Sequence, residues 1–216
     1  GGFGHVAVNT EDVYKLSKTL ASKGISFKKK PDEGRMKGLA FAYDADRNWV
    51  EIVERSEKYA HKNLCNFSQI MLRIKDPKKS VPFYRDLLKM TVVREIHFPK
   101  EKGDFSLYFM ATLTPEQRKI CPDPTSPAAR EFVKTLHNPV LELTHNHGTE
   151  VSDEPSYHTG NSDNFSFGHI GFLVNDVYTM CDKLEKAGVA FHKKPDDGTM
   201  KGLAFALDPD GYRIEL

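Results

Sequence analysis

A histidine and a glutamate occur twice in this chain, at the start and at the end of a repeated segment. His5 and Glu51 belong to the first copy, and His169 and Glu215 take the same places in the second, each 164 positions further along. An imidazole and a carboxylate on one sheet face suit a divalent metal, because they combine nitrogen and oxygen donors. The plainer alternative is a histidine that only fills a core. The repeat favours the metal interpretation, because the pair is kept while many neighbours differ.

Two polar residues of the middle segment are further candidates. Gln69 and Glu142 lie on its first and last predicted strands, and Glu142 interrupts an otherwise apolar run. A carboxylate that points into a sheet costs several kcal/mol unless it is paired or bound to a metal. The alternative is a glutamate that faces solvent on an edge strand.

The elements that must position these residues follow one order in the first segment. Residues 3–8 alternate as a half-buried strand does, and the stripe from Val13 to Ala21 predicts a helix that ends at Gly24. The remaining predicted strands are 25–27, 39–43 and 48–53. The segment is therefore predicted to be βαβββ.

The middle segment shows the same order without clear sequence similarity. Asp76 and Pro77 start its helix, and residues 112–138 form an insertion expected to be a surface loop with a helical turn at 128–136. Its predicted strands are 67–74, 91–98, 105–111 and 140–144. We therefore expect an α+β protein with βαβββ modules at 1–60, 61–150 and 151–216, joined by polar linkers at 54–62 and 148–164.

Composition limits the functional classes. The 216 residues are 39% apolar and 28% charged, which is typical of a globular protein, and the formal charge of +1 gives no support for a nucleic-acid surface. No apolar run approaches a membrane helix, so no membrane partner is expected. Three cysteines without a C-x-x-C spacing predict reduced thiols in the cytoplasm. The chain starts just before one repeat and stops inside a predicted strand, so we expect it to be part of a longer protein.

These segments together resemble the glyoxalase I family, the lactoylglutathione lyases of the vicinal-oxygen-chelate superfamily. The matching text is QIMLRIKDPKKSVPFYRDLLKM, FSLYF, VLELTHNHGTE, GFGH and KKPDDGTMKGLAFALDPDGYRIE, and it covers nearly the whole chain outside 112–138. The resemblance implies tandem βαβββ modules that pair into curved eight-stranded sheets around a metal site. In this family each unit consists of an N-terminal module (N-type) followed by a C-terminal module (C-type). The order here is C-type, N-type, C-type, which is similar to the fused two-unit form without its first N-type module.

The resemblance also implies the ligands and the metal. One complete site would consist of Gln69 and Glu142 from the N-type module with His5 and Glu51 from the first C-type module. A glutamine at the first ligand position is similar to the zinc-using class, with another divalent metal as the alternative. His169 and Glu215 would be half a site, which the missing module or a second chain could complete.

For the substrate, the resemblance implies glutathione and a small aldehyde. The residues carried over for glutathione are Arg73, Asn146, Lys29, Arg35 and Met36, with Lys193 and Met200 in the second copy. Trp49, a further substrate-binding candidate, lies two residues before Glu51, and Arg213 takes the same place before Glu215 in the second copy. The apolar pocket for the aldehyde-derived group maps to Phe98, Leu107, Phe109, Leu39 and Phe41. The chain departs from the family at Gly1 and Phe165, where an arginine is usual, and at His147, where a tryptophan is usual.

The activity implied is the isomerisation of the hemithioacetal of glutathione and methylglyoxal to S-D-lactoylglutathione, a detoxification by metal-assisted proton transfer. Glu51 would be the main base and Glu142 the second glutamate. Two alternatives stay open. One is a catalytically silent module that binds a metal or a glutathione conjugate, which the lost arginines favour. The other is a different metalloenzyme of the superfamily, although such enzymes prefer two histidines and one carboxylate.

Overall fold

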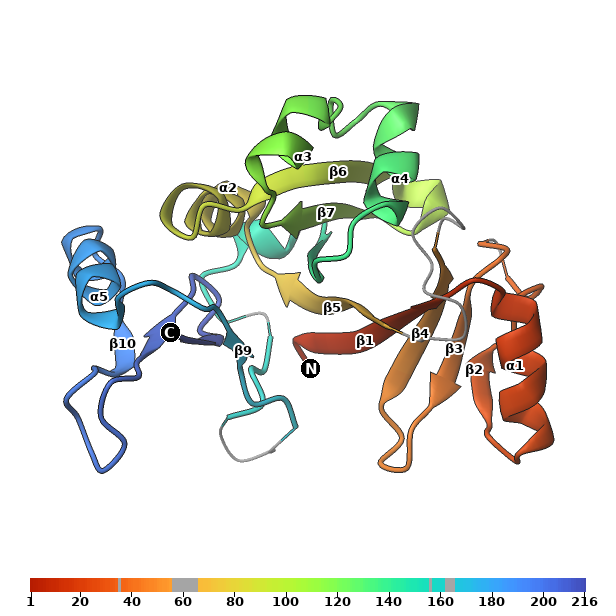
Figure 1. Cartoon of the computed structure of the whole chain (residues 1–216), viewed down its shortest axis with the longest axis horizontal. Helices are drawn as coiled ribbons and strands as arrows, with labels where there is room; N and C mark the ends of the chain where they lie inside the picture. The colour runs from red at the N-terminus through yellow and green to blue at the C-terminus, as the bar shows by residue number, and fades with distance from the viewer. Residues whose placement is uncertain (35, 56–65, 156, 162–165) are drawn as a thin grey trace. The chain divides into compact units, whose positions relative to one another are not determined.

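The computed structural model describes residues 1–34, 36–55, 66–155, 157–161 and 166–216, and it shows an α+β protein with two sheets (Figure 1). The predicted fold class is confirmed. Most of the predicted linker 54–62 lies outside the described residues, so its structure stays a prediction.

The first repeat folds in the predicted order. Its elements are β1 (Phe3–Thr10), α1 (Val13–Ser22), β2 (Phe27–Lys29), β3 (Ala40–Tyr43) and β4 (Trp49–Glu54). Helix α1 begins where Asp12 accepts a hydrogen bond from the backbone N–H of Lys15 at 2.8 Å. It ends before Gly24, whose φ of 84° is the left-handed conformation that glycine adopts at low cost.

The middle segment contains four strands and several short helices. They are β5 (Asn66–Ile74), α2 (Pro77–Pro82), the π-helical turn η2 (Phe83–Leu87), β6 (Thr91–Phe98), the 3₁₀ turn η3 (Lys100–Lys102), β7 (Phe105–Ala111), α3 (Pro115–Ile120), α4 (Pro127–Lys134), β8 (Val140–Asn146) and the 3₁₀ turn η4 (Thr149–Val151). The bounds predicted for β6 and β7 agree with the structure.

The helical turn predicted at 128–136 is confirmed as α4, whereas the prediction that the rest of 112–138 is only a surface loop is wrong. The segment forms α3 and α4, and it places Leu113, Phe132 and Leu136 in one buried cluster with Phe109 and Val140. Each buried side chain of this size contributes about 2 kcal/mol. Two of its four prolines, Pro115 and Pro127, stand at helix starts, where a missing N–H costs nothing, and Pro122 and Pro124 lie between the helices.

Arg55 closes this cluster from the end of β4. Its side chain is 3% exposed and donates a hydrogen bond to the carbonyl oxygen of Leu136 at 2.5 Å. Burial lowers the pKa of this guanidinium. The contact ties β4 to the segment that follows α4.

The larger sheet has eight strands in the order β2-β3-β4-β1-β5-β8-β7-β6. β1 and β4 are parallel, with Ala7 beside Glu51, and β3 runs antiparallel to β4 with Phe41 beside Glu51. The first repeat and the middle segment thus join edge to edge at β1 and β5. Four consecutive strands of the sheet, β4, β1, β5 and β8, carry the four candidate ligands.

The second repeat forms a four-stranded sheet of its own. Its elements are β9 (Ile170–Gly171), α5 (Val177–Lys186), β10 (Phe191–Lys193), β11 (Phe205–Leu207) and β12 (Arg213–Glu215). The order β10-β11-β12-β9 matches β2-β3-β4-β1, including the parallel pair β9 and β12. β9 is the last strand in that order, whereas β1 continues to β5.

The chain forms two compact units that do not follow the predicted module limits. One consists of residues 1–3, 73–89 and 145–216, and the other of residues 4–72 and 90–144. Within the first unit, α2 and η2 bind the turn 208–212: Tyr84 donates to Asp208 at 2.6 Å, and Ser80 donates to Asp210 at 2.6 Å. These bonds explain why α2 belongs with the second repeat. The module limits themselves stay a prediction.

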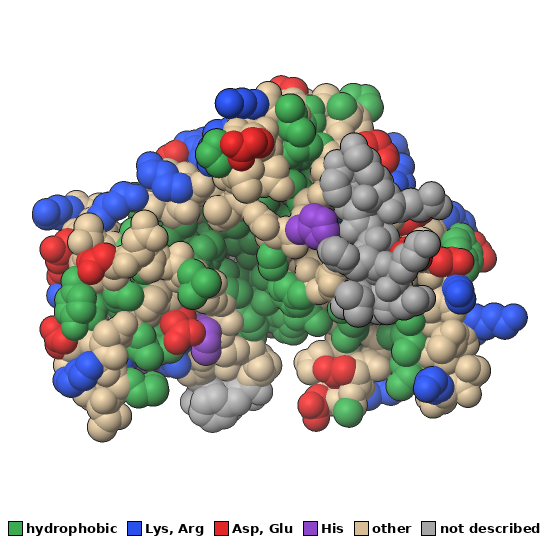
Figure 2. All heavy atoms as spheres, in the orientation of Figure 1, with side chains coloured by type: hydrophobic (Ala, Val, Ile, Leu, Met, Phe, Trp, Pro, Cys, Tyr) green, Lys and Arg blue, Asp and Glu red, His purple; other side chains and the backbone are tan. Residues whose placement is uncertain are grey.

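On the face shown in Figure 2, basic and acidic side chains are interspersed. Cys121 and Cys181 are free thiols, and Cys65 lies outside the described residues. In the described part of the chain, no helix has the length and apolar character to cross a membrane.

Candidate metal centre

Strand alternation directs the four predicted ligands inward. Along β1, every second residue from His5 to Asn9 is buried, and Glu51 lies in the buried middle of β4. Gln69 and Glu142 take buried positions on β5 and β8. The exposed fractions are 5% for His5, 6% for Glu51 and for Glu142, and 8% for Gln69.

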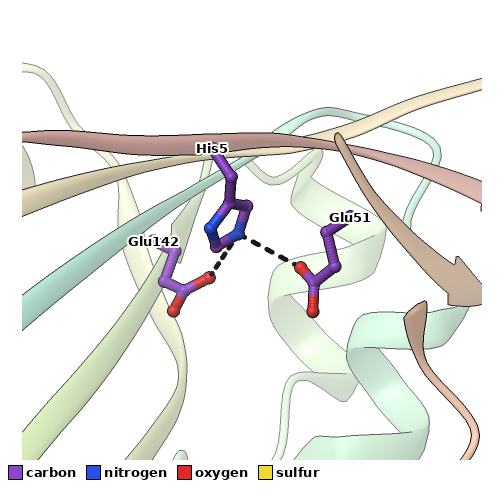
Figure 3. A group of neighbouring side chains, drawn as sticks. All are labelled: His5, Glu51 and Glu142. Carbon is purple, nitrogen blue, oxygen red and sulfur yellow. Dashed lines mark ion pairs between the residues drawn. The ribbon is translucent and has the colours of Figure 1, made fainter. Parts of the chain in front are cut away.

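The side chains of these residues converge on one point. The Nε2 atom of His5 lies 3.2 Å from Glu51 Oε2 and 3.6 Å from Glu142 Oε2 (Figure 3). The Nε2 group of Gln69 donates to Glu51 at 2.9 Å and to Glu142 at 2.6 Å. The ligand atoms of His5, Glu51 and Glu142 all lie within 4.8 Å of one another. The structure therefore brings together the whole set predicted for one site.

The charges of this cluster act strongly on one another. Burial alone would lower the pKa of His5, but the hydrogen bonds and charges of Glu142 and Glu51 outweigh it and raise that pKa to about 9. Burial raises the pKa of Glu142, and the nearby charge of Glu51 adds to the increase. The site thus holds two buried acidic groups that favour an added positive charge.

The donor set fits a divalent cation. It offers one imidazole nitrogen, two carboxylates and one amide group, which is a mixture that zinc accepts. The amide of Gln69 turns its Nε2 to the carboxylates here, and its carbonyl oxygen is the atom that a metal would take. Such an ion would neutralise carboxylates that are otherwise costly to bury.

The second repeat forms the same pair in a more open setting. His169 Nε2 lies 2.9 Å from Glu215 Oε2, with side chains 44% and 34% exposed. His169 meets Phe205 edge to face at 5.3 Å, as His5 meets Phe41 at 5.3 Å. The local geometry is repeated, and the role of this pair as half a site stays a prediction.

Aromatic side chains flank the centre. Phe41 contacts both His5 and Trp49 through edge-to-face pairs, and Phe98 stacks on Phe105 at 4.5 Å. Phe109 is buried, whereas Leu39 and Leu107 are partly exposed. The assignment of these residues to an aldehyde pocket stays a prediction.

The lysines predicted to bind glutathione are occupied within their own loops. Lys29 Nζ donates to the carbonyl oxygen of Leu39 at 2.6 Å, and Lys193 does the same to Leu203 at 2.7 Å. Each ammonium group also donates to the carbonyl oxygen of the following residue, Lys30 or Lys194. Two of three donors are therefore in use, so a carboxylate would find one free N–H on each lysine.

The other residues predicted to bind glutathione are placed as follows. Arg73 Nη1 donates to the carbonyl oxygens of Gly1 and Phe3, each at 3.3 Å, and Asn146 donates to the hydroxyl group of Tyr157 at 2.8 Å. Met36 and Met200 are exposed at equivalent positions of the two copies, and Arg35 lies outside the described residues. Their binding roles stay predictions.

The sequence interpretation missed Arg94. It lies on β6 opposite Phe109, with its guanidinium carbon 5.7 Å from the centre of that ring. The resemblance assigned Phe98 to the predicted pocket, and strand alternation places Arg94, four residues earlier, on the same face as Phe98. That signal was available in the sequence.

A proton should leave His5 when a divalent ion binds. With a pKa of about 9, the imidazole is protonated at neutral pH, and a metal requires its neutral form. We expect close to one proton released per zinc at pH 7, and an apparent zinc affinity that rises with pH until it levels off near that pKa. Titration calorimetry in two buffers of different ionisation enthalpy measures the release. His169→Ala should leave it unchanged, and zinc binding at pH 7 without proton release would contradict the prediction.

A family model described as Glyoxalase/Bleomycin resistance protein/Dioxygenase superfamily matches residues 1–52 and 66–216. The chain therefore belongs to this superfamily, as the resemblance implied.

Individual relatives give a narrower comparison than the superfamily. The chain is 39% identical over 218 residues to the lactoylglutathione lyase of Schizosaccharomyces pombe and 36% identical over 222 residues to the glyoxalase I of Saccharomyces cerevisiae. All of the chain is covered, with 66% and 63% of the two relatives. The crystal structure of glyoxalase I from Zea mays has a TM-score of 0.68 at 25% identity, covering 100% of this chain and 67% of that one. The chain thus spans about two thirds of the length of these three proteins.

Proposed function

We propose that this chain carries a glyoxalase I site and isomerises the hemithioacetal of glutathione and methylglyoxal to S-D-lactoylglutathione, as a lactoylglutathione lyase. The observation that supports this most is the convergence of Gln69, Glu142, His5 and Glu51 in one buried centre. Relatives with names of this activity match the whole chain. The free thiols Cys121 and Cys181 are compatible with the cytoplasm as the place of the reaction.

Zinc would be held by these four residues. When bound, it would draw electron density from the oxygens of the substrate and so make the neighbouring carbon-bound proton more acidic. The remaining chemistry belongs to the chain. Glu51 takes the proton from the carbon that carries sulfur, and negative charge passes to the two adjacent oxygens. The proton returns to the neighbouring carbon, and the hydroxyl proton of the hemithioacetal passes from the first oxygen to the second. No atom is gained or lost, so the product is an isomer of the substrate.

The buried setting suits such a proton transfer. Glu51 is 6% exposed, so water competes little for its carboxylate. Glu142 is equally buried, and burial raises its pKa. It would serve as the second glutamate, able to accept or hold a proton on the other side of the substrate.

Glutathione would be bound by charge-assisted hydrogen bonds from Arg73, Lys29 and Arg35, with Asn146 as a neutral partner. Trp49 and Met36 would add apolar contacts. Phe98, Leu107, Phe109, Leu39 and Phe41 would surround the group derived from the aldehyde. In the second copy, Lys193 and Met200 would have the same roles beside the half-site of His169 and Glu215, once an N-type module or a second chain supplies the other ligands.

Zinc content and turnover test the proposal together. We expect one zinc per chain and thioester formation from methylglyoxal and glutathione. His5→Ala should lower turnover by at least about a hundredfold, because loss of one ligand weakens the metal site. His169→Ala is the matched control at the repeated position and should retain turnover. Zinc bound without any turnover would leave the silent binding module as the function of this chain.

A further inference from the structure

Arg94 places a positive charge on the face of the sheet that the aldehyde-derived group would meet. Arg94 pairs with Phe109 across β6 and β7, and Phe98 pairs with Phe105 further along the same hairpin. Residues directly opposite each other, and residues two apart along a strand, share a face. The guanidinium therefore lies on the same face as Phe98 and Phe109.

The metal-binding residues point to that face as well. Val140 packs in one cluster with Phe109, and Glu142 follows Val140 by two residues on β8, the strand beside β7. Burial and the charge of Arg130 lower the pKa of Arg94, and the charges of Glu131 and Glu142 oppose that effect, so Glu142 is one of the groups that act on Arg94 electrostatically. Arg94 thus belongs to the wall of the proposed site.

This guanidinium has no carboxylate partner within ion-pair distance among the described residues. Its recorded contact is the ring of Phe109, and the side chain is partly buried. A guanidinium in such a place keeps its charge and leaves its planar pair of N–H donors available. Those donors match the two oxygens of a carboxylate.

We infer that Arg94 forms an anion subsite, and that the preferred substrates of this chain are 2-oxoaldehydes whose carbon chain ends in a carboxylate. The inference rests on the proposed function, because it names the substrate class of the same site. Methylglyoxal has no such group, so it would gain nothing from Arg94.

The test compares two glutathione conjugates that differ in the end of their S-substituent. S-(carboxypropyl)glutathione carries a carboxylate, and S-butylglutathione carries a methyl group in its place. Calorimetry with the zinc-loaded chain gives both dissociation constants without any turnover. We expect the carboxylate conjugate to bind about ten times more tightly, as one charge-assisted contact typically allows.

Three variants decide whether Arg94 causes the preference. Arg94→Gln should abolish it, and Arg94→Lys should keep part of it. Arg130→Gln removes an exposed charge from α4 that also acts on Arg94, and it should change the preference less than twofold. Equal binding of the two conjugates to the wild type, or an equal effect of Arg130→Gln, would overturn the inference.

A failure of the proposed function would give a different result from a failure of the anion subsite. If the zinc-loaded chain converts the methylglyoxal hemithioacetal but binds both conjugates equally, the anion subsite is wrong and the activity stands. If neither conjugate binds and no hemithioacetal is converted, the glutathione-dependent function is wrong and the subsite with it.

Discussion

Glu51→Gln should lower kcat/KM for the methylglyoxal hemithioacetal by about a thousandfold, the range lost when a positioned base is removed. The amide keeps the size of the side chain and an oxygen donor for a metal, but it cannot accept a proton. Zinc affinity should therefore fall less than turnover does. Stopped-flow measurement of thioester formation and calorimetry with zinc separate the two effects.

Glu215→Gln is the matched control for this variant. It changes the same residue at the repeated position, where the pair with His169 is partly exposed. We expect turnover to stay within about twofold of the wild type, since a surface change away from the site rarely matters more. A thousandfold loss in Glu142→Gln with little loss in Glu51→Gln would instead assign the base to Glu142.

The two copies show which part of the site is local in origin. In both copies the histidine lies beside the glutamate and meets a neighbouring phenylalanine ring edge to face. The distance between the ring centres of histidine and phenylalanine is 5.3 Å in each copy. Such features follow from strand alternation and the parallel pairing of the first and last strands, so the sequence predicts them. Burial differs, because β1 continues to β5 whereas β9 ends its sheet. That difference depends on which segments meet, and no local pattern contains it.

Two other features that the sequence analysis did not predict also depend on which segments meet in the fold. The insertion at 112–138 contains prolines that favour a loop, yet the burial of Phe132 and Leu136 in one cluster with Phe109 stabilises α4. Strand alternation in the sequence places Arg94 on the face of Phe98, but its pairing with Phe109 is known only from the structure. Most strands and helices can thus be predicted from the sequence, whereas the residues that they pack against are known only from the structure.

The turn from Asp208 to Tyr212 shows how a repeated sequence gains a new role. In the first copy, Asp44 is exposed and accepts hydrogen bonds from Asn48, which hold its pKa below the usual range. In the second copy, Asp208 is 5% exposed and accepts from Tyr84 at 2.6 Å. Burial raises the pKa of Asp208 to about 7. The pKa of aspartate is thus shifted in opposite directions at the two equivalent positions.

Stability should therefore fall with rising pH because of Asp208. Below about pH 3 the carboxyl is protonated in both the folded and the unfolded chain. Between there and its folded pKa of about 7, the unfolded chain releases the proton while the folded chain retains it, so unfolding becomes easier. Above that pKa the cost is constant, and it reaches on the order of 4 kcal/mol.

Asp208→Asn should remove this pH dependence. Relative to the wild type, its free energy of unfolding should rise by up to about 4 kcal/mol between pH 4 and 7. The single tryptophan, Trp49, belongs to the other compact unit, so urea unfolding should be followed by circular dichroism, which reports on both units. Asp44→Asn is the control and should run parallel to the wild type above pH 4.5 or so, where an exposed aspartate is already ionised. Parallel curves for Asp208→Asn and the wild type would mean that Asp208 is ionised in the folded chain across this range, and that its contact with Tyr84 is enough to offset burial.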